Sequence, residues 1–177
     1  MRFVRSVVGV LALILFSLSV GLAQETCKRN LEPQGGFSVC VPEGWSVQVR
    51  ESEKFKMMFA PRAETFTANI NIKIEESSTP LSSYAGASIK KVLASSSTLG
   101  ANSIKLVSWS DFSSTSGLAA NRVVFETEYK GLLITTVQYY FDSERNQKFV
   151  FTGTCLLKDR DAFESIFERA AKSFRLE

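Results

Sequence analysis

Apolar and polar residues alternate over several short stretches of the chain, as they do in strands that bury one face. The clearest stretch spans residues 67–75, where one alanine and three isoleucines alternate with polar side chains. A period of two places these four apolar side chains on one face of a strand. Three shorter strand-like stretches precede it, at residues 37–41, 45–50 and 55–60. Because residues 42–44 have the composition of a turn, we expect 37–41 and 45–50 to form a hairpin.

The second half of the chain contains four longer strand-like segments. They are residues 104–112, 121–129, 132–141 and 149–156. The connections between them are polar and short, and one is the tight turn at Lys130 and Gly131. Parallel neighbours would need a crossover of a dozen or more residues. We therefore expect these segments to form a consecutive antiparallel meander.

A helix is predicted between the two groups of strands. Apolar residues recur at three- and four-residue spacing from Leu81 to Leu93, which gives a single apolar stripe. The preceding residues 77–80, Ser-Ser-Thr-Pro, predict a hydroxyl cap followed by proline at the first helical position. Gly100 is a suitable stop.

The last helix has the clearest apolar face in the chain, made by Phe163, Ile166, Phe167, Ala170 and Phe174. Asp161 and Glu164 have the spacing of a capping box at its start, and Asp159 is an equally plausible cap. The order of elements is thus strands, helix, strands, helix. It predicts an α+β fold with a mostly antiparallel central sheet flanked by helices.

Residues 1–23 have the three parts of a cleavable secretory signal peptide. A short positive segment is followed by an apolar run over 7–20 and by small residues at the −3 and −1 positions of a cut after Ala23. The run is shorter than the ~20 apolar residues of a membrane span, which favours cleavage over a retained anchor. Lipid attachment to Cys27 is disfavoured, because polar residues, Glu25 among them, stand directly before it.

The rest of the chain has the size of one domain. Residues 24–36 are polar and contain a proline and a glycine pair, so we expect an N-terminal arm or loop there. Residues 37–177 are rich in phenylalanine and β-branched residues and are expected to fold as a single domain. The signal peptide predicts an exported protein, periplasmic or extracellular, that meets a membrane only by proximity or if residues 1–23 are retained.

Three cysteines, Cys27, Cys40 and Cys155, remain after export. An oxidising compartment allows one disulfide and one leftover thiol, and three pairings are possible. We favour Cys27 as one member of a pair, since a bond there would tie down the N-terminus. Buried thiols are the alternative. Neither Cys40 nor Cys155 has a basic neighbour in sequence to activate it.

Composition excludes several classes of function. Removing residues 1–23 takes two arginines from the 21 Lys and Arg and leaves 18 Asp and Glu, so the exported chain is nearly neutral and no nucleic-acid partner is expected. The sequence has no histidine, which removes the usual nucleophile activation and the commonest metal ligand. Nucleotide-binding glycine motifs and Cys-x-x-Cys spacings are also missing, so we expect no cofactor and no metal.

Two kinds of side chain remain as site candidates. Glycoside hydrolysis needs only two carboxylates, and the pairs are Glu75 with Glu76 and Glu126 with Glu128. Solvated charges on the outer face of a sheet are the more common origin of such pairs. Aromatic residues form the second kind: Trp45, Trp109, Tyr139 and Tyr140 could line a ligand groove or a partner face, and of these Trp109, Tyr139 and Tyr140 are the partner-facing candidates. Core packing is the more common role of aromatic residues in an antiparallel sheet. The two tyrosines point to opposite sides of their strand, so we expect at least one of them to face outward.

The chain resembles the PsbP-like superfamily, which includes PsbP of photosystem II, the DcrB-like envelope proteins of bacteria and the Mog-type Ran-binding factors. The resemblance spans residues 37–174 and lies in the order of three features. They are Phe37-x-Val39-x-Val41-Pro42-x-x-Trp45, the isoleucine strand, and a last helix with Phe163-x-x-Ile166 and Ser173-Phe174. It implies a sheet flanked by helices in an α/β/α sandwich, in an exported bacterial member with a non-enzymatic binding or assembly role.

Together these features predict an exported, non-catalytic binding or assembly module that acts on another, unidentified envelope or exported protein. The first alternative is a carrier of a small apolar ligand, held between sheet and helix. A hydrolase that uses carboxylates alone is the weaker alternative.

Overall fold

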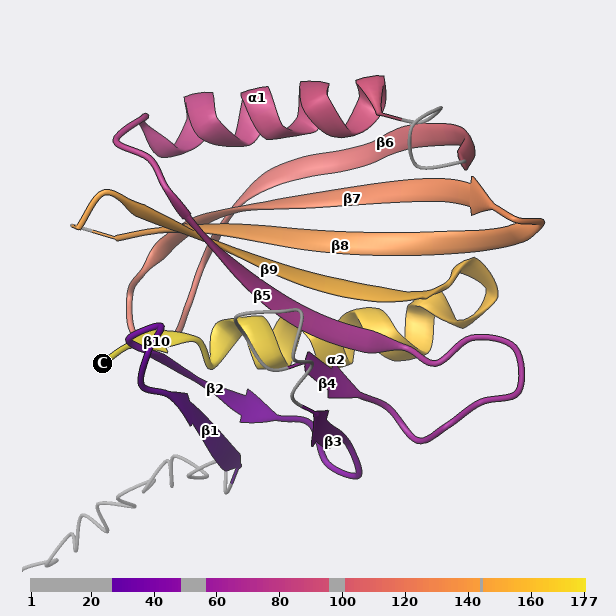
Figure 1. Cartoon of the computed structure of the whole chain (residues 1–177), viewed down its shortest axis with the longest axis horizontal. Helices are drawn as coiled ribbons and strands as arrows, with labels where there is room; N and C mark the ends of the chain where they lie inside the picture. Colours follow the sequence, from indigo (N-terminus) through magenta and orange to yellow (C-terminus); the bar gives the residue numbers. More distant parts are fainter. Residues whose placement is uncertain (1–26, 49–56, 96–100, 144) are drawn as a thin grey trace, which may run out of the picture.

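Two antiparallel sheets carry most of the chain in the computed structural model, which describes residues 27–48, 57–95, 101–143 and 145–177 (Figure 1). The larger sheet has the strand order β3-β4-β5-β9-β8-β7-β6, and the smaller has the order β1-β2-β10. The strands are β1 (Lys28–Glu32), β2 (Phe37–Val41), β3 (Ser46–Gln48), β4 (Met57–Phe59), β5 (Asn69–Glu76), β6 (Ala101–Ser113), β7 (Ala119–Tyr129), β8 (Leu132–Asp142), β9 (Gln147–Leu156) and β10 (Arg175–Leu176). The helices are α1 (Leu81–Ala94) and α2 (Arg160–Lys172), the latter preceded by the short 3-10 helix η1 (Leu157–Asp159).

The predicted meander is confirmed. Strands β6 to β9 follow one another in space as in sequence, each antiparallel to the next. The isoleucine strand β5 then joins the far side of β9, with Ile72 opposite Phe151. This pairing places β5 next to β9, the last strand of the meander, although α1 and β6 to β8 lie between the two strands in sequence. The result is the antiparallel α+β architecture that the sequence predicts.

Each face of the larger sheet is covered by a different helix (Figure 1). Helix α1 packs over β6, β7 and β8 and closes a small core that contains Ile89, Phe125 and Tyr140. Helix α2 and the smaller sheet cover the opposite face and close the main core, where Ile70, Phe151 and Phe167 are fully buried. Because both faces are covered, the central strands are buried on both sides.

The predicted hairpin around residues 42–44 is wrong. Strand β2 pairs with β1 on one side and β10 on the other, whereas β3 pairs with β4 in the larger sheet. The turn therefore carries the chain from one sheet to the other. An alternating pattern identifies the buried face of a strand but contains no information about which strand it pairs with. The short turn between the two strands therefore did not show that they pair with each other.

The predicted arm is also wrong for its central residues, since Lys28–Glu32 forms β1. These residues pair along the whole of β2, from Lys28 opposite Val41 to Glu32 opposite Phe37. Their polar composition is that of a strand at the edge of a small sheet, which has little apolar surface to bury. Residues 24–26 and the expected cleavage site at Ala23 lie outside the described residues.

The helix starts differ in part from the prediction, and of the two candidate caps of α2 it is Asp159, not Asp161, that occupies the N-cap position. Pro80 occupies the N-cap position of α1 and Asp159 that of α2, and in both cases the side chain makes no capping hydrogen bond. In α2, Glu164 pairs with Arg122 of β7 and with Arg160, the first residue of the helix. These ion pairs compete with the capping box. Within the described residues, no helix has the length and apolar character needed to cross a membrane.

Candidate functional site

The cysteines separate into a disulfide and a buried thiol. Cys27 and Cys40 are joined across the paired strands β1 and β2, with their Cα atoms 5.5 Å apart. Cys155 of β9 is buried against the face covered by α2. Burial, together with the nearby carboxylates of Asp159 and Glu164, raises the pKa of the Cys155 thiol to about 12. A thiol held in this protonated state is a poor nucleophile.

Tyr139 and Tyr140 are not surface residues, so the prediction that one of them faces outward is wrong. They point to opposite faces of β8 as expected, but a helix covers each face. The ring of Tyr139 lies 4.6 Å from that of Phe112 on the α2 side, and Tyr140 lies 5.9 Å from Tyr84 on the α1 side. Their exposed fractions are 0% and 1%. Burial raises the pKa of Tyr139 to about 12 and raises that of Tyr140 as well.

Trp109, by contrast, is 46% exposed. It stands on β6 opposite Val123, on the face of the sheet that α1 covers. A Cβ atom on Gly86 of α1 would lie 3.5 Å from the Cη2 atom of the indole, so the ring rests beside the helix at this glycine. The indole is therefore held from one side and open to solvent on the other.

Strand β6 forms one edge of the larger sheet. Its first half carries two register shifts, at Ala101/Ser103 and Leu106/Ser108, and an exposed lysine at position 105. Bulges and lysines are the usual means of blocking an open sheet edge. From Ser108 to Ser113 the pairing with β7 is uninterrupted and the strand has neither device. Its one charged residue, Asp111, accepts a hydrogen bond from the neighbouring Asn121 of β7. Among the described residues, this second half of β6, with Trp109 on it, is an unblocked edge.

One member of each carboxylate pair, Glu126 and Glu75, is held by neighbouring cations. Glu126 makes ion pairs with Lys105 and Arg160, at 3.9 and 3.5 Å. Glu75 accepts hydrogen bonds from Lys73 and from the hydroxyl of Tyr84, and the Lys73 contact lowers its pKa. A general acid needs a raised pKa, which is the opposite of the shift at Glu75.

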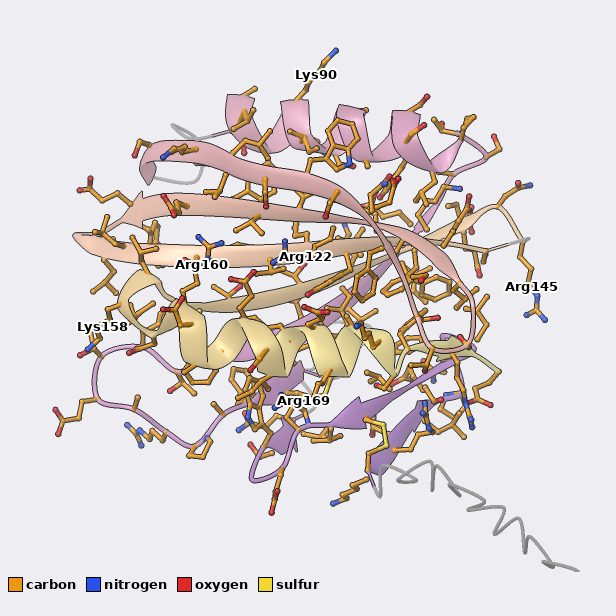
Figure 2. The ribbon with its side chains drawn as sticks, turned by 180° about the vertical axis from the view of Figure 1, so that it is seen from behind. Lys90, Arg122, Arg145, Lys158, Arg160 and Arg169 are labelled. Atoms are coloured by element: carbon orange, nitrogen blue, oxygen red, sulfur yellow. A yellow bond between two sulfur atoms is a disulfide. The ribbon has the colours of Figure 1, made fainter. Side chains whose placement is uncertain are left out.

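Arg122, Arg160 and Glu164 form a charge network between β7 and α2. Glu164 is held by Arg122 and, at 2.8 Å, by the Nε atom of Arg160. Figure 2 shows the two arginines on the sheet side of α2. Since each carboxylate here is paired with fixed cations, the network fastens the start of α2 to the sheet.

A groove of about 840 Å³ opens beside the disulfide and is lined by Trp45, one of the aromatic candidates, although the sequence did not predict the other residues that line it. Cys27 and Lys28 line one wall, residues 42–45 form a second, and Ile166, Arg169 and Ala170 of α2 form the third. Figure 2 shows Arg169 on the side of α2 away from Arg122 and Arg160. The three walls come from distant parts of the sequence. The helical spacing from Ile166 to Arg169 and Ala170 was the one signal that could have placed residues on this face.

No group of three or more carboxylate, cysteine or histidine side chains within the described ranges is arranged to hold a metal ion. The charged clusters that do occur pair acids with bases. Among the features of the described residues that could contact other molecules are the open end of β6 at Trp109 and the groove beside the disulfide.

Comparison by sequence finds no relative, since no family model and no curated protein matches the chain. Comparison by structure does. The solution structure of the cyanobacterial PsbP protein, CyanoP, from Synechocystis sp. PCC 6803 matches with a TM-score of 0.65 and 13% identity. The match covers 89% of this chain and 96% of CyanoP.

Two other solved structures are similar. The Ran-binding protein Mog1p of Saccharomyces cerevisiae has a TM-score of 0.58 at 11% identity, with 85% of this chain and 95% of Mog1p covered. LpqN of Mycobacterium tuberculosis, described as involved in cell envelope biogenesis, has a TM-score of 0.57 at 11% identity, with 87% of each chain covered. At such identities the likeness concerns the fold. The chain has the PsbP-like, Mog-type fold that its resemblance over residues 37–174 implies.

Proposed function

We propose that this chain is an exported, non-catalytic binding module that docks an extended segment of another cell-envelope protein on the open end of β6. The observation that carries the proposal is Trp109, a large apolar side chain that is 46% exposed on an unblocked sheet edge. Tryptophan is enriched among the residues that dominate binding energy at protein interfaces. Packing of the core does not explain why this side chain is exposed, whereas binding of a partner does.

The occupant follows from the chemistry of the edge. An edge strand presents a row of backbone N–H and C=O groups, and an extended polypeptide is the ligand that matches their spacing. Ser108 to Ser113 provides six consecutive residues of regular strand for such pairing. Trp109 would then fill an apolar position beside the added strand, next to Gly86 of α1.

Three observations support export and an envelope setting. Residues 1–23 have the form of a signal peptide. The Cys27–Cys40 disulfide is typical of oxidising compartments. LpqN, which has the same fold, is described as involved in cell envelope biogenesis, and Mog1p as a Ran-binding protein. LpqN is thus an example of the fold in the cell envelope, and Mog1p is an example of the fold in a protein that binds another protein.

The structure gives less support to a carrier with its ligand between sheet and helix. On the α1 side that space is filled by Phe125, Tyr140 and Ile89, and on the α2 side by Phe151 and Phe167. A ligand there would have to displace fully buried rings.

Site-specific photocrosslinking in the cells that make the protein tests the proposal. A photoreactive amino acid replaces Ser110, which is exposed next to Trp109 on β6. We expect one dominant crosslinked protein, and we expect the crosslink to disappear in a Trp109→Ala background. The matched control is Leu133→Ala, which truncates an apolar side chain that is 55% exposed on β8. The control should retain the crosslink.

The result that would overturn the proposal is equally specific. If the adduct persists in the Trp109→Ala background, or if a probe at Lys90 on the exposed side of α1 captures the same protein equally well, β6 is not the docking edge (Figure 2). Turnover of a defined substrate by the purified protein would contradict the non-catalytic assignment.

A further inference from the structure

We propose that the groove beside the Cys27–Cys40 disulfide binds a small amphiphilic anion, whose apolar body lies against Trp45 and whose acidic group is held by Arg169 and Lys28. This site is separate from the β6 edge and independent of the function proposed above. Its volume of about 840 Å³ lies in the range of small-molecule sites, roughly 300–1,000 Å³.

The apolar side of the groove is built around a fixed aromatic ring. Trp45 lies edge-on to Phe163 and Phe167 of α2, with centroid distances of 6.1 and 6.3 Å. These contacts hold the indole while leaving it part of the groove wall. Ile166 and Ala170 of α2 continue the apolar surface. A preset ring of this kind offers contact area without loss of side-chain freedom on binding.

The polar side of the groove has more positive than negative charge. Lys28 and Arg169 line it together with a single carboxylate, Glu43. Both cations are exposed, and no ion pair joins either of them to another described residue. A carboxylate, phosphate or sulfate group on the ligand would supply the missing partner.

Arg169 has no ion-pair partner among the described residues, unlike the other basic residues of α2. Arg160 pairs with Glu126 and Glu164, and Lys172 pairs with Glu168 four residues before it. Arg169 lies on the opposite side of the helix from Arg160, over the groove (Figure 2). A guanidinium group presents a planar fork of donors that matches a two-oxygen acid, so it is suited to fix the acidic end of a ligand.

The combination of an apolar wall and unpaired cations selects the ligand class. A purely apolar molecule would leave the two cations without a partner, and an inorganic anion would leave the Trp45 surface in water. An organic acid with an alkyl or aromatic body satisfies both. The proposed ligand is the free organic acid, and because the headgroup of an anionic membrane lipid has similar chemistry, the experiment distinguishes the two.

Dodecanoate below its micelle concentration is the probe, and Trp45 fluorescence is the signal. The exported protein carries Trp109→Phe, so that Trp45 is the remaining tryptophan. We expect a saturable change in emission with dodecanoate and a much weaker one with uncharged dodecanol. Arg169→Gln should raise the dissociation constant about tenfold, the loss expected for one charged hydrogen-bonding partner. Lys28→Gln should raise it to a smaller extent, because an ammonium group lacks the fork.

The control is Lys158→Gln, since Lys158 is an exposed cation at the other end of α2 (Figure 2). It should leave the dissociation constant unchanged, and near-ultraviolet circular dichroism should show that every variant is folded. The proposal fails if dodecanoate gives no saturable change, if dodecanol binds as tightly, or if Arg169→Gln binds like the parent. It also fails, in favour of a membrane surface, if the protein sediments with phosphatidylglycerol vesicles through Arg169 but does not bind monomeric dodecanoate.

Discussion

Gly153 of β9 lies directly against the ring of Phe167 of α2. A Cβ atom on the glycine would be 2.5 Å from Cγ of that ring and 2.7 Å from both Cδ atoms, closer than carbon atoms can approach. The ring is fully buried and has Trp45 and Phe163 beside it, so it has little room to move. The glycine therefore sets how closely the last helix approaches the sheet.

Gly153→Ala should lower the free energy of unfolding by about 1–3 kcal/mol, the usual effect of overpacking a core. Chemical denaturation followed by tryptophan fluorescence measures it. Gly86→Ala on α1 is the matched control, because its Cβ would meet Trp109 at an ordinary 3.5 Å. That change should stabilise the protein by roughly 0.5–1 kcal/mol, since alanine is the better helix residue. Adding Phe167→Leu to Gly153→Ala should cost less than the two changes separately, and strict additivity would show that the contact is not the cause.

Glu164→Gln should destabilise the protein by about 1–3 kcal/mol, because it leaves Arg122 and Arg160 facing each other with no shared carboxylate. The two arginine side chains are only 16% and 26% exposed, so water screens their repulsion incompletely. Glu168→Gln breaks a more exposed pair with Lys172 and should change stability by less than about 0.5 kcal/mol. Thermal unfolding of the two variants at low and high salt makes the comparison. Equal effects would mean that the Glu164 network contributes no more than a surface pair.

Replacing both Cys27 and Cys40 by serine should cost about 3 kcal/mol through loss of loop closure, given their separation of 13 residues. The fold should persist, since β1 keeps its pairing with β2 and Arg29 still donates to Ser38 and to the carbonyl of Ser173. The free energy of unfolding with and without reductant tests this for the parent protein. A parent that is indifferent to reductant would contradict the expectation.

Cys155 should be inert toward thiol reagents in the folded protein and reactive once it unfolds. Burial raises the pKa of Cys155 from an ordinary 9.0 to about 12, so the reactive thiolate is scarce at neutral and mildly alkaline pH. Because the folded pKa lies above the unfolded one, the linked stability is complete below about pH 9 and is lost as pH rises toward 12. Labelling with a chromogenic disulfide at pH 8, with and without denaturant, measures the reactivity. Rapid labelling of the native protein would refute the buried placement.

The meander β6 to β9 and the strand β5 could be predicted because their signals are local, whereas the pairing of β3 with β4 and of β5 with β9 could not. The isoleucine alternation of β5 and the short turns of the meander depend on neighbours in sequence. The exposure of Tyr139 and Tyr140 could not be predicted in this way. Their opposite directions follow from strand geometry, but their burial depends on which helix covers each face, and this is decided by distant packing.

The groove was beyond sequence reasoning for the same reason. Lys28, Trp45 and Arg169 have no common motif, and they meet because β1, the turn after β2 and α2 are brought together by the smaller sheet and the disulfide. Trp109 was identified as a candidate from its residue type. Its position on the unblocked half of β6 required the strand order, which the alternation pattern does not contain.

The smaller sheet has a consequence for the order in which the strands of the domain can pair. Its middle strand, β2, pairs on one side with β10, and Leu176 lies opposite Phe37 although almost the whole domain separates them in sequence. Contacts of such long sequence separation form slowly, because the intervening chain must first be confined. Under the export proposed above, which delivers the N-terminus first, β2 keeps one edge unpaired until Arg175 and Leu176 have emerged. During that interval the strand can pair wrongly, and a chaperone that shields it would have its substrate at this edge.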